Sequence, residues 1–342
     1  MPVAHIRPIV KVLLTGATSA AGQYILQTLM TTDHDVRVLA LPDTMHRIQF
    51  RDRIDIVPGD LRDDTSLREA ADGVELVFHT ALVQPSATMD RRTLEALNIE
   101  GTERLVAAVA PSARRIVLVT SSAVYADHLA PALWPVTDGS ERYPSGPPAT
   151  AAFTETLIAA EDRFLDMADT LGFEHVILRP TLLGGRKAPS IEQLLTAALK
   201  RPDLIEGQHD VLGLMHWLHG SDLGAAALLV GEDPRAADRA FLAAGPEPIT
   251  IYDAQRILWN VMHVGREDNP HTDAAYAANL GLPKYVSDGL HALGWRARIP
   301  ASEIVMEALG RLDFKTSESL RLPAHLISEV VDQGPPAHMD PA

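Results

Sequence analysis

Two glycines, Gly16 and Gly22, enclose a run of small residues at positions 17–21. A chain that turns tightly from a strand into a helix points the unpaired N–H groups and the positive end of the helix dipole at one spot. That spot suits a phosphate group. We therefore predict that Gly16 makes the tight turn, that Gly22 lets the helix pack against the strand, and that the loop binds nucleotide phosphates.

The segments on either side of this loop fit that prediction. An apolar, β-branched run at residues 9–14 has the composition of a strand buried on both faces, and a helical pattern starts at Gln23. Further along, strand-like runs alternate with helical patterns, which predicts an α/β fold with helices on both faces of a parallel sheet. The predicted strands are 35–41, 54–58, 76–79, 115–120, 175–178 and 240–244, and the predicted helices are 91–109, 150–171, 191–200, 252–264 and 302–312.

The composition excludes several classes of protein. The chain has 342 residues, 46% of them hydrophobic, which is enough for a large core and a smaller lobe. A formal net charge of −15 argues against a nucleic-acid surface, and the absence of cysteine excludes disulfides and thiolate zinc sites. No apolar window reaches the ~18 residues of a membrane helix, and no His, Asp and Glu cluster has metal spacing. The first strand leaves no room for a signal peptide, so we expect a cytoplasmic protein.

Eight segments, in order along the chain, resemble motifs of the extended short-chain dehydrogenase/reductase family, also called the NAD-dependent epimerase/dehydratase family. The glycine loop is similar to the family's Thr-Gly-Ala-Thr-Gly-x-x-Gly motif, with Ser19 in place of the middle glycine. Residues 120–125 resemble its Thr-Ser-Ser-x-x-Val-Tyr-Gly motif, shortened by one residue. The other six segments are 59–61, 78–81, 98–102, 178–184, 217–222 and 287–295.

The resemblance implies a Rossmann-type doubly wound parallel sheet with a small C-terminal substrate lobe. It implies an NAD(P)-binding domain over residues 1–184, a mainly substrate-binding lobe over 185–312 that returns some segments to the sheet, and an extension over 313–342. The cofactor is NAD or NADP, and Asp43 and Arg47, after the second strand, leave that choice open. The residues that the resemblance places at the cofactor are Gly16, Thr18, Ser19, Ala20, Ala21, Gly22, Asp60, Leu61, Thr80, Ala81, Leu82, Asn98, Thr120, Pro180, Thr181 and Leu182.

The acid–base pair of this family is missing from the sequence. Its members use a Tyr-x-x-x-Lys pair on the long helix, in which the lysine lowers the pKa of the tyrosine that moves a proton. When Glu161 is aligned with the family's glutamate, Phe153 takes the tyrosine position and Leu157 the lysine position, and no tyrosine is followed four residues later by a lysine. Both belong to an apolar helical stripe that runs to Leu171, so we expect core packing, with contact to an apolar substrate as the alternative.

Ser121 and Tyr125 are the remaining candidates for catalysis. Ser121 stands four residues before Tyr125, the family's spacing for the serine that orients the substrate. Ser122 is the competitor, and both serines can instead cap the end of the strand. Tyr125 can donate a proton, although the resemblance favours packing.

Two main functions therefore stay open, with a purely structural subunit of the same fold as a third. The first is a non-standard oxidoreductase or isomerase/lyase-type enzyme that acts on a small molecule. The second is a catalytically inactive nucleotide- or metabolite-binding regulatory protein of the same fold. In either case we expect a small-molecule ligand and neither nucleic acid nor membrane as a partner. The resemblance also implies a homodimer formed through the helices at 91–109 and 150–171.

Overall fold

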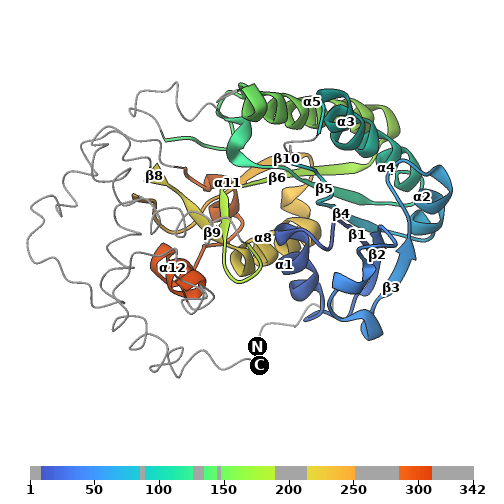
Figure 1. Cartoon of the computed structure of the whole chain (residues 1–342), viewed down its shortest axis with the longest axis horizontal. Helices are drawn as coiled ribbons and strands as arrows, with labels where there is room; N and C mark the ends of the chain where they lie inside the picture. The colour runs from blue at the N-terminus through green and yellow to red at the C-terminus, as the bar shows by residue number, and fades with distance from the viewer. Residues whose placement is uncertain are drawn as a thin grey trace, which may run out of the picture.

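Seven parallel strands form the central sheet of the computed structural model, in the spatial order β10-β6-β5-β4-β1-β2-β3 (Figure 1). The order reverses between β1 and β4, as at the switch point of a doubly wound sheet. The predicted α/β fold class is confirmed. The strands are β1 (Lys11–Thr15), β2 (Asp35–Ala40), β3 (Asp55–Pro58), β4 (Leu76–His79), β5 (Arg115–Val119), β6 (Glu174–Pro180) and β10 (Arg239–Ala243).

The structure describes residues 9–84, 89–125, 135–144, 148–188, 214–250 and 285–309. The helices predicted at 191–200 and 252–264 lie outside these ranges, as does the extension at 313–342. Within the described ranges no helix is both long and apolar enough to cross a membrane.

Helices cover both faces of the sheet (Figure 1). Val12 and Leu14 of β1 enter a core with α1 and α8, whereas Leu13 enters a second core with α2, α4 and α5. This alternation is the two-residue period of a strand buried on both sides. The helices are α1 (Ala20–Leu29), α2 (Asp64–Ala71), α3 (Arg91–Glu95), α4 (Gly101–Val109), α5 (Pro148–Leu171), α8 (Gly220–Glu232), α11 (Asp288–Ala292) and α12 (Ala301–Leu309), with 3-10 turns at Met45–Arg47, Arg51–Arg53, Ser122–Val124 and Pro234–Ala236.

The helices differ from the prediction at 91–109 and in the presence of α2, α8 and α11, which are not among the predicted helices. The helix expected at 91–109 is divided by a π-helical turn (Ala96–Glu100) between α3 and α4, and this turn buries Asn98 completely. The sequence patterns also fail to predict α8, because this helix is apolar on most of its surface. It is buried between α1 and the sheet and so lacks the one-sided pattern of a surface helix.

Short elements follow the strands in the described residues beyond position 181. Asp222, in the first turn of α8, joins this helix to residues 295–299: its carboxylate accepts from the N–H groups of Arg298 and Ile299, both at 3.0 Å. Its carbonyl oxygen accepts from the indole N–H of Trp295 at 3.2 Å, so the motifs at 217–222 and 287–295 meet in space. The short strands are β7 (Leu182–Gly184) paired with β9 (Trp217–His219), and β8 (Leu214–Met215) paired with β11 (Ile249–Thr250).

Candidate functional site

The glycine loop joins β1 to α1 as predicted, and the geometry requires glycine at both ends of it. Gly16 has a φ of +74°, and an added Cβ would lie 2.7 Å from backbone atoms of Thr80 and Ala81. An added Cβ on Gly22 would overlap the carbonyl oxygen of Gly16. The loop therefore lies directly against the first turn of α1 and against the segment after β4.

The first turn of α1 leaves two donors at its N-terminus. Ser19 is the N-cap, and its hydroxyl oxygen accepts from the N–H of Gly22 at 3.0 Å. The N–H groups of Ala20 and Ala21 have no acceptor within the described part of the chain, as is normal for a first helical turn. Two N–H groups at the positive end of the helix dipole fit a pyrophosphate.

The loop after β3 carries Asp60 in an ion pair. Arg62 donates from Nε and Nη2 to the two carboxylate oxygens, at 3.0 and 2.5 Å. These hydrogen bonds lower the pKa of Asp60. Leu61 is buried next to Gly101 at the start of α4. A ligand group that hydrogen-bonds to the Asp60 carboxylate must therefore share it with Arg62.

His79 joins three elements beneath the loop. Its ring nitrogens lie 2.6 Å from the Thr15 hydroxyl and 3.0 Å from the Thr102 hydroxyl. Because Thr102 donates to the carbonyl oxygen of Asn98, Nε2 of His79 carries the proton and Nδ1 accepts from Thr15. Complete burial lowers the pKa of His79 from 6.5 to about 4. His79 is thus a neutral link between β1, β4 and α4.

Asn98 holds the segment after β4 in place. Its Oδ1 accepts from the N–H of Val83 at 2.7 Å, and its Nδ2 donates to the Val83 carbonyl oxygen at 3.0 Å and to the Thr156 hydroxyl at 3.1 Å. The side chain is fully buried and its amide groups are used within the protein. Asn98 therefore fixes the segment that carries Ala81 and Leu82 and ties it to α5.

Thr120 and Ser121 follow β5, near the middle of the sheet. The Thr120 hydroxyl donates to Glu161 at 2.7 Å. The Ser121 hydroxyl oxygen accepts from the N–H of Ala123 at 3.1 Å, so it caps the 3-10 turn that follows. Ser122 is buried. Of the two serines, Ser121 is the more exposed, and capping is the role that the structure displays for it.

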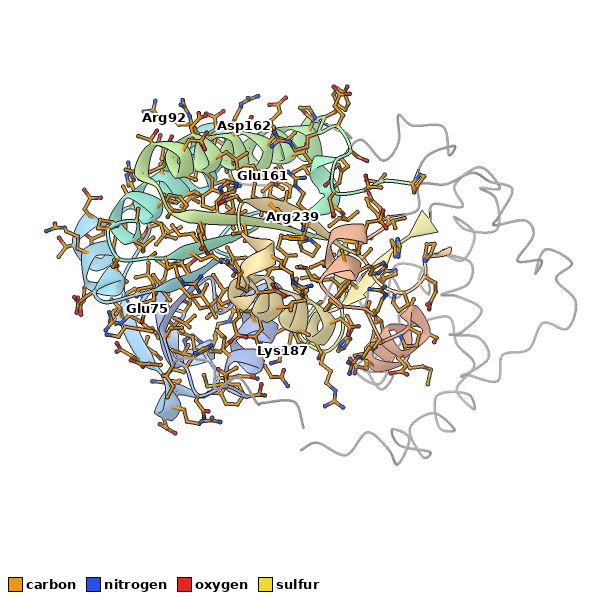
Figure 2. The ribbon with its side chains drawn as sticks, turned by 180° about the vertical axis from the view of Figure 1, so that it is seen from behind. Glu75, Arg92, Glu161, Asp162, Lys187 and Arg239 are labelled. Atoms are coloured by element: carbon orange, nitrogen blue, oxygen red, sulfur yellow. The ribbon has the colours of Figure 1, made fainter. Side chains whose placement is uncertain are left out.

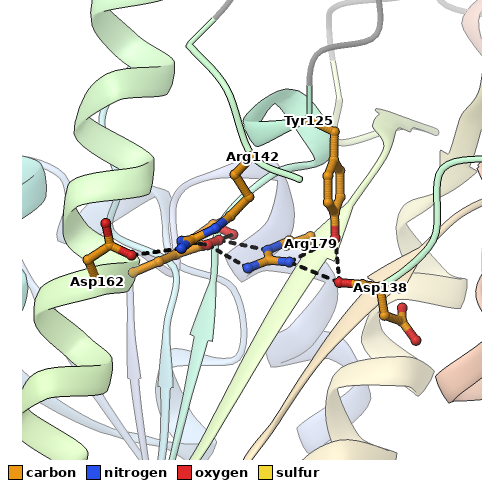
Figure 3. A network of polar contacts seen from close by, with 7 residues as sticks. Tyr125, Asp138, Arg142, Asp162 and Arg179 are labelled. Carbon is orange, nitrogen blue, oxygen red and sulfur yellow. Dashed lines mark hydrogen bonds and ion pairs between the residues drawn. The ribbon is translucent and has the colours of Figure 1, made fainter. Parts of the chain in front are cut away.

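Tyr125 belongs to a buried polar network (Figure 3). Arg179 of β6 donates to both carboxylate oxygens of Glu161, at 3.0 and 2.7 Å, and to the Tyr125 hydroxyl at 2.8 Å. The Tyr125 hydroxyl donates in turn to the carbonyl oxygen of Asp138 at 3.2 Å. Tyr125 is 1% exposed, and burial raises its pKa. Its phenol is held inside the protein as a neutral hydrogen-bond donor.

The network includes two residues that no sequence pattern singled out, Asp138 and Arg142. Arg142 donates to Glu161 at 2.8 Å and to Asp162 at 2.7 Å. The Asp138 carboxylate accepts from the backbone N–H of Leu242, in β10, at 2.6 Å and from that of Gly289, in α11, at 2.9 Å. No local motif marks this pair, because the partners lie between 13 and 151 residues away.

Phe153 and Leu157 lie on the inner side of α5. Leu157 is 1% exposed and packs in an apolar cluster that also contains Leu242, and Phe153 is partly buried against the same cluster. The predicted core stripe is confirmed from Leu157 to Phe164. It is wrong at Leu171, which is 47% exposed at the end of the helix.

The segment after β6 contains an unpaired hydroxyl. The N–H of Thr181 donates to the carbonyl oxygen of Ala243 at 2.9 Å, but its hydroxyl is buried and has no hydrogen-bond partner in the described structure. The same is true of the indole N–H of Trp217, in the strand that pairs with β7. Buried polar groups without partners are rare, so both are groups for which a ligand can supply the partner. Pro180 ends β6, and Leu182 is half exposed.

Comparison with known proteins finds a matching family model, similar proteins and a similar solved structure. A family model described as NAD dependent epimerase/dehydratase family matches residues 12–244. The chain is 26% identical over 313 residues to a 4-hydroxy-2-methyl-3-oxo-4-farnesyl-3,4-dihydroquinoline-1-oxide ketoreductase of Stigmatella aurantiaca, covering 88% of this chain and 87% of that protein. It is 25% identical over 259 residues to a 3 beta-hydroxysteroid dehydrogenase/Delta 5-->4-isomerase of Mycobacterium tuberculosis, covering 72% and 68%. Its fold is similar to that of a short-chain dehydrogenase/reductase superfamily protein from Agrobacterium tumefaciens with bound NAD, with a TM-score of 0.67, 21% identity and coverage of 87% and 95%.

Proposed function

This chain belongs to the NAD dependent epimerase/dehydratase family, and on that basis we propose that it binds NAD or NADP at the glycine loop and acts on a small molecule. The observation that carries the proposal is the tight loop from Gly16 to Gly22, which we call the cradle. The N–H groups of Ala20 and Ala21 at this loop have no acceptor in the described part of the chain. Backbone donors at a helix N-terminus are what a pyrophosphate requires.

The other predicted contacts divide between the two halves of the dinucleotide. Thr18 and Ser19 flank the pyrophosphate, and Asp60 and Leu61 face the adenine. The nicotinamide half is contacted from the ends of the other strands, by Thr80, Ala81, Leu82, Thr120, Pro180, Thr181 and Leu182. The unpaired Thr181 hydroxyl fits a polar group of this half. When bound, the nicotinamide supplies a hydride donor or acceptor.

The reaction does not use the family's tyrosine and lysine. Phe153 and Leu157 occupy those positions and have no proton to exchange. We propose a non-standard oxidoreductase or isomerase/lyase-type reaction, with Ser121 as the hydroxyl nearest to the substrate. The partly buried ring of Phe153 supports a substrate with an apolar surface. The names of two relatives agree, since one specifies a farnesylated quinoline oxide and the other a steroid.

A regulatory protein without catalysis is the second candidate. It is favoured by the apolar cluster around Leu157, which leaves no titratable group at the expected lysine position, and by the burial of Tyr125 within its own network. Both candidate functions include the nucleotide site, but only the enzyme would convert a substrate into a product. Incubation with NAD(P)H and apolar ketones, followed by product analysis, separates them.

A crystal structure with bound NAD⁺ tests the proposal. We expect the pyrophosphate on the N–H groups of Ala20 and Ala21, and the nicotinamide between Ser121 and Phe153. A dinucleotide bound at another place would contradict it. Cytoplasmic location and a homodimer remain predictions. Charged side chains such as Arg92 of α3 and Asp162 of α5 lie on the outer side of these helices (Figure 2), so such a dimer contact would have to accommodate them.

A further inference from the structure

The single proton of the Thr120 hydroxyl is already committed. It is donated to Oε1 of Glu161 at 2.7 Å. Glu161 also accepts from Arg179, at 3.0 and 2.7 Å, and from Arg142 at 2.8 Å. Both oxygens of this fully buried carboxylate accept from guanidinium N–H groups, which can only donate, so the carboxylate acts here only as an acceptor. The Thr120 oxygen therefore keeps its lone pairs for a ligand and has no proton to offer.

The network leaves Glu161 no alternative orientation. A rotation away from Thr120 would also break the paired hydrogen bonds from Arg179 (Figure 3). Arg179 itself is fixed by the hydroxyl of Tyr125 at 2.8 Å. Burial opposes the charge of Arg179, yet hydrogen bonds and charge from Glu161 raise its pKa. Contacts in the core thus fix the direction of the Thr120 hydroxyl proton, and this direction stays the same when a ligand enters.

We propose that Glu161 is a positioning residue that makes Thr120 an obligate hydrogen-bond acceptor, so that the ligand group opposite Thr120 must carry an O–H or N–H. The inference rests on the dinucleotide site proposed above. Thr120 follows β5, on the β4 side of the switch point, where the sheet receives the nicotinamide riboside. The donors of that half are its ribose hydroxyls and its carboxamide N–H groups.

The experiment compares two ligands on the full chain by calorimetry. NAD⁺ carries the nicotinamide riboside, and ADP lacks it. Thr120→Val removes the acceptor at nearly constant shape and is expected to weaken NAD⁺ binding about 3- to 10-fold while leaving ADP binding unchanged. Thr120→Ser keeps the hydroxyl and should bind both ligands like the parent. Equal losses for NAD⁺ and ADP in Thr120→Val, or no loss for either, would overturn the inference.

A double-mutant cycle tests the role of Glu161. Glu161→Gln frees the Thr120 proton, because an amide can donate to the hydroxyl as well as accept from it. We expect the ratio of NAD⁺ to ADP affinity to fall about 3- to 10-fold in the Thr120 parent and to stay unchanged in the Thr120→Val background. The same fall in both backgrounds would show that Glu161 does not act through Thr120. If Glu161→Gln does not fold, Glu161→Asp takes its place, because it keeps the charge but is too short to reach Thr120. Absence of NAD⁺ binding by the unmodified protein would instead refute the proposed function.

Discussion

The Cα of Gly22 packs so closely against the carbonyl oxygen of Gly16 that an added Cβ would overlap it. This contact brings the first turn of α1 onto the end of β1. The N–H groups of Ala20 and Ala21 and the positive end of the helix dipole then meet above the loop. The proposed nucleotide site is a consequence of this contact.

Substitution Gly22→Ala is expected to separate the loop from the helix. The overlap with Gly16 should lower the free energy of unfolding by about 1–3 kcal/mol and weaken dinucleotide binding at least ~10-fold. Urea unfolding and calorimetric titration measure the two effects. The matched control is Gly139→Ala, since an added Cβ there meets no atom within 4 Å. Unchanged nucleotide affinity in Gly22→Ala would contradict the prediction.

Arg115 is expected to be essential for stability. It is fully buried and donates from Nη1 to the carbonyl oxygens of Val230, Gly231 and Asp233, at 2.9, 3.3 and 2.8 Å, and so closes the end of α8. Arg115→Met leaves these carbonyl oxygens without that partner and should lower the free energy of unfolding by about 3 kcal/mol. Arg114, which is half exposed and pairs with the same Glu174 as Arg115, provides the control.

The expected loss for Arg114→Met is under ~1 kcal/mol, the range of surface ion pairs. Similar losses for the two variants would show that burial of Arg115 and its contacts with α8 do not add to the free energy of unfolding. Chemical denaturation at one pH measures both.

His79 makes stability depend on pH in the acid range. Burial lowers its folded-state pKa from 6.5 to about 4. Between these values the unfolded chain binds a proton that the folded chain does not, so His79 favours folding above pH ~6.5 and this contribution is lost as the pH falls towards ~4. The loss is on the order of 3 kcal/mol. Urea unfolding at several pH values should show a shallower acid slope for His79→Gln than for the parent, and parallel slopes would refute the assignment.

Leu157→Lys is expected to destabilise the protein rather than restore an acid–base pair. The new ammonium group would lie in the apolar cluster with Val124 and Leu242. A buried charge without a partner costs several kcal/mol, and we expect a loss of at least ~3 kcal/mol at pH 7. Leu157→Met keeps the volume and should cost less than ~1.5 kcal/mol. Thermal melts of the two variants measure the contrast, and a Leu157→Lys variant as stable as Leu157→Met would contradict the structure.

The parts of the fold that depend on local patterns could be predicted. The apolar run before Gly16 predicts β1, and the small residues up to Gly22 predict the turn into α1, because both depend on near neighbours in the sequence. Helix α8 is not recognisable in this way, because it is buried between α1 and the sheet and therefore has no amphipathic pattern. For Leu157, the helical period predicts that the side chain is buried but does not predict which residues surround it.

The polar network could not be predicted for a related reason. Glu161 is recognisable only as part of a resemblance, and nothing in the sequence near Arg142 or Asp138 indicates that these residues join it. Their partners come from distant segments that the folded sheet brings together. For Tyr125 the resemblance favours packing, and its 1% exposure agrees, but no local pattern indicates that Arg179 and the carbonyl oxygen of Asp138 are its hydrogen-bond partners.

Titration of the unmodified protein with NAD⁺, NADH, NADP⁺ and NADPH tests the central claim most directly. The cradle at Gly16 and Gly22 predicts saturable one-to-one binding of at least one of these dinucleotides, displaced by ADP. Saturable binding with ADP competition is the predicted result. No heat of binding and no fluorescence change with any of the four would contradict the account.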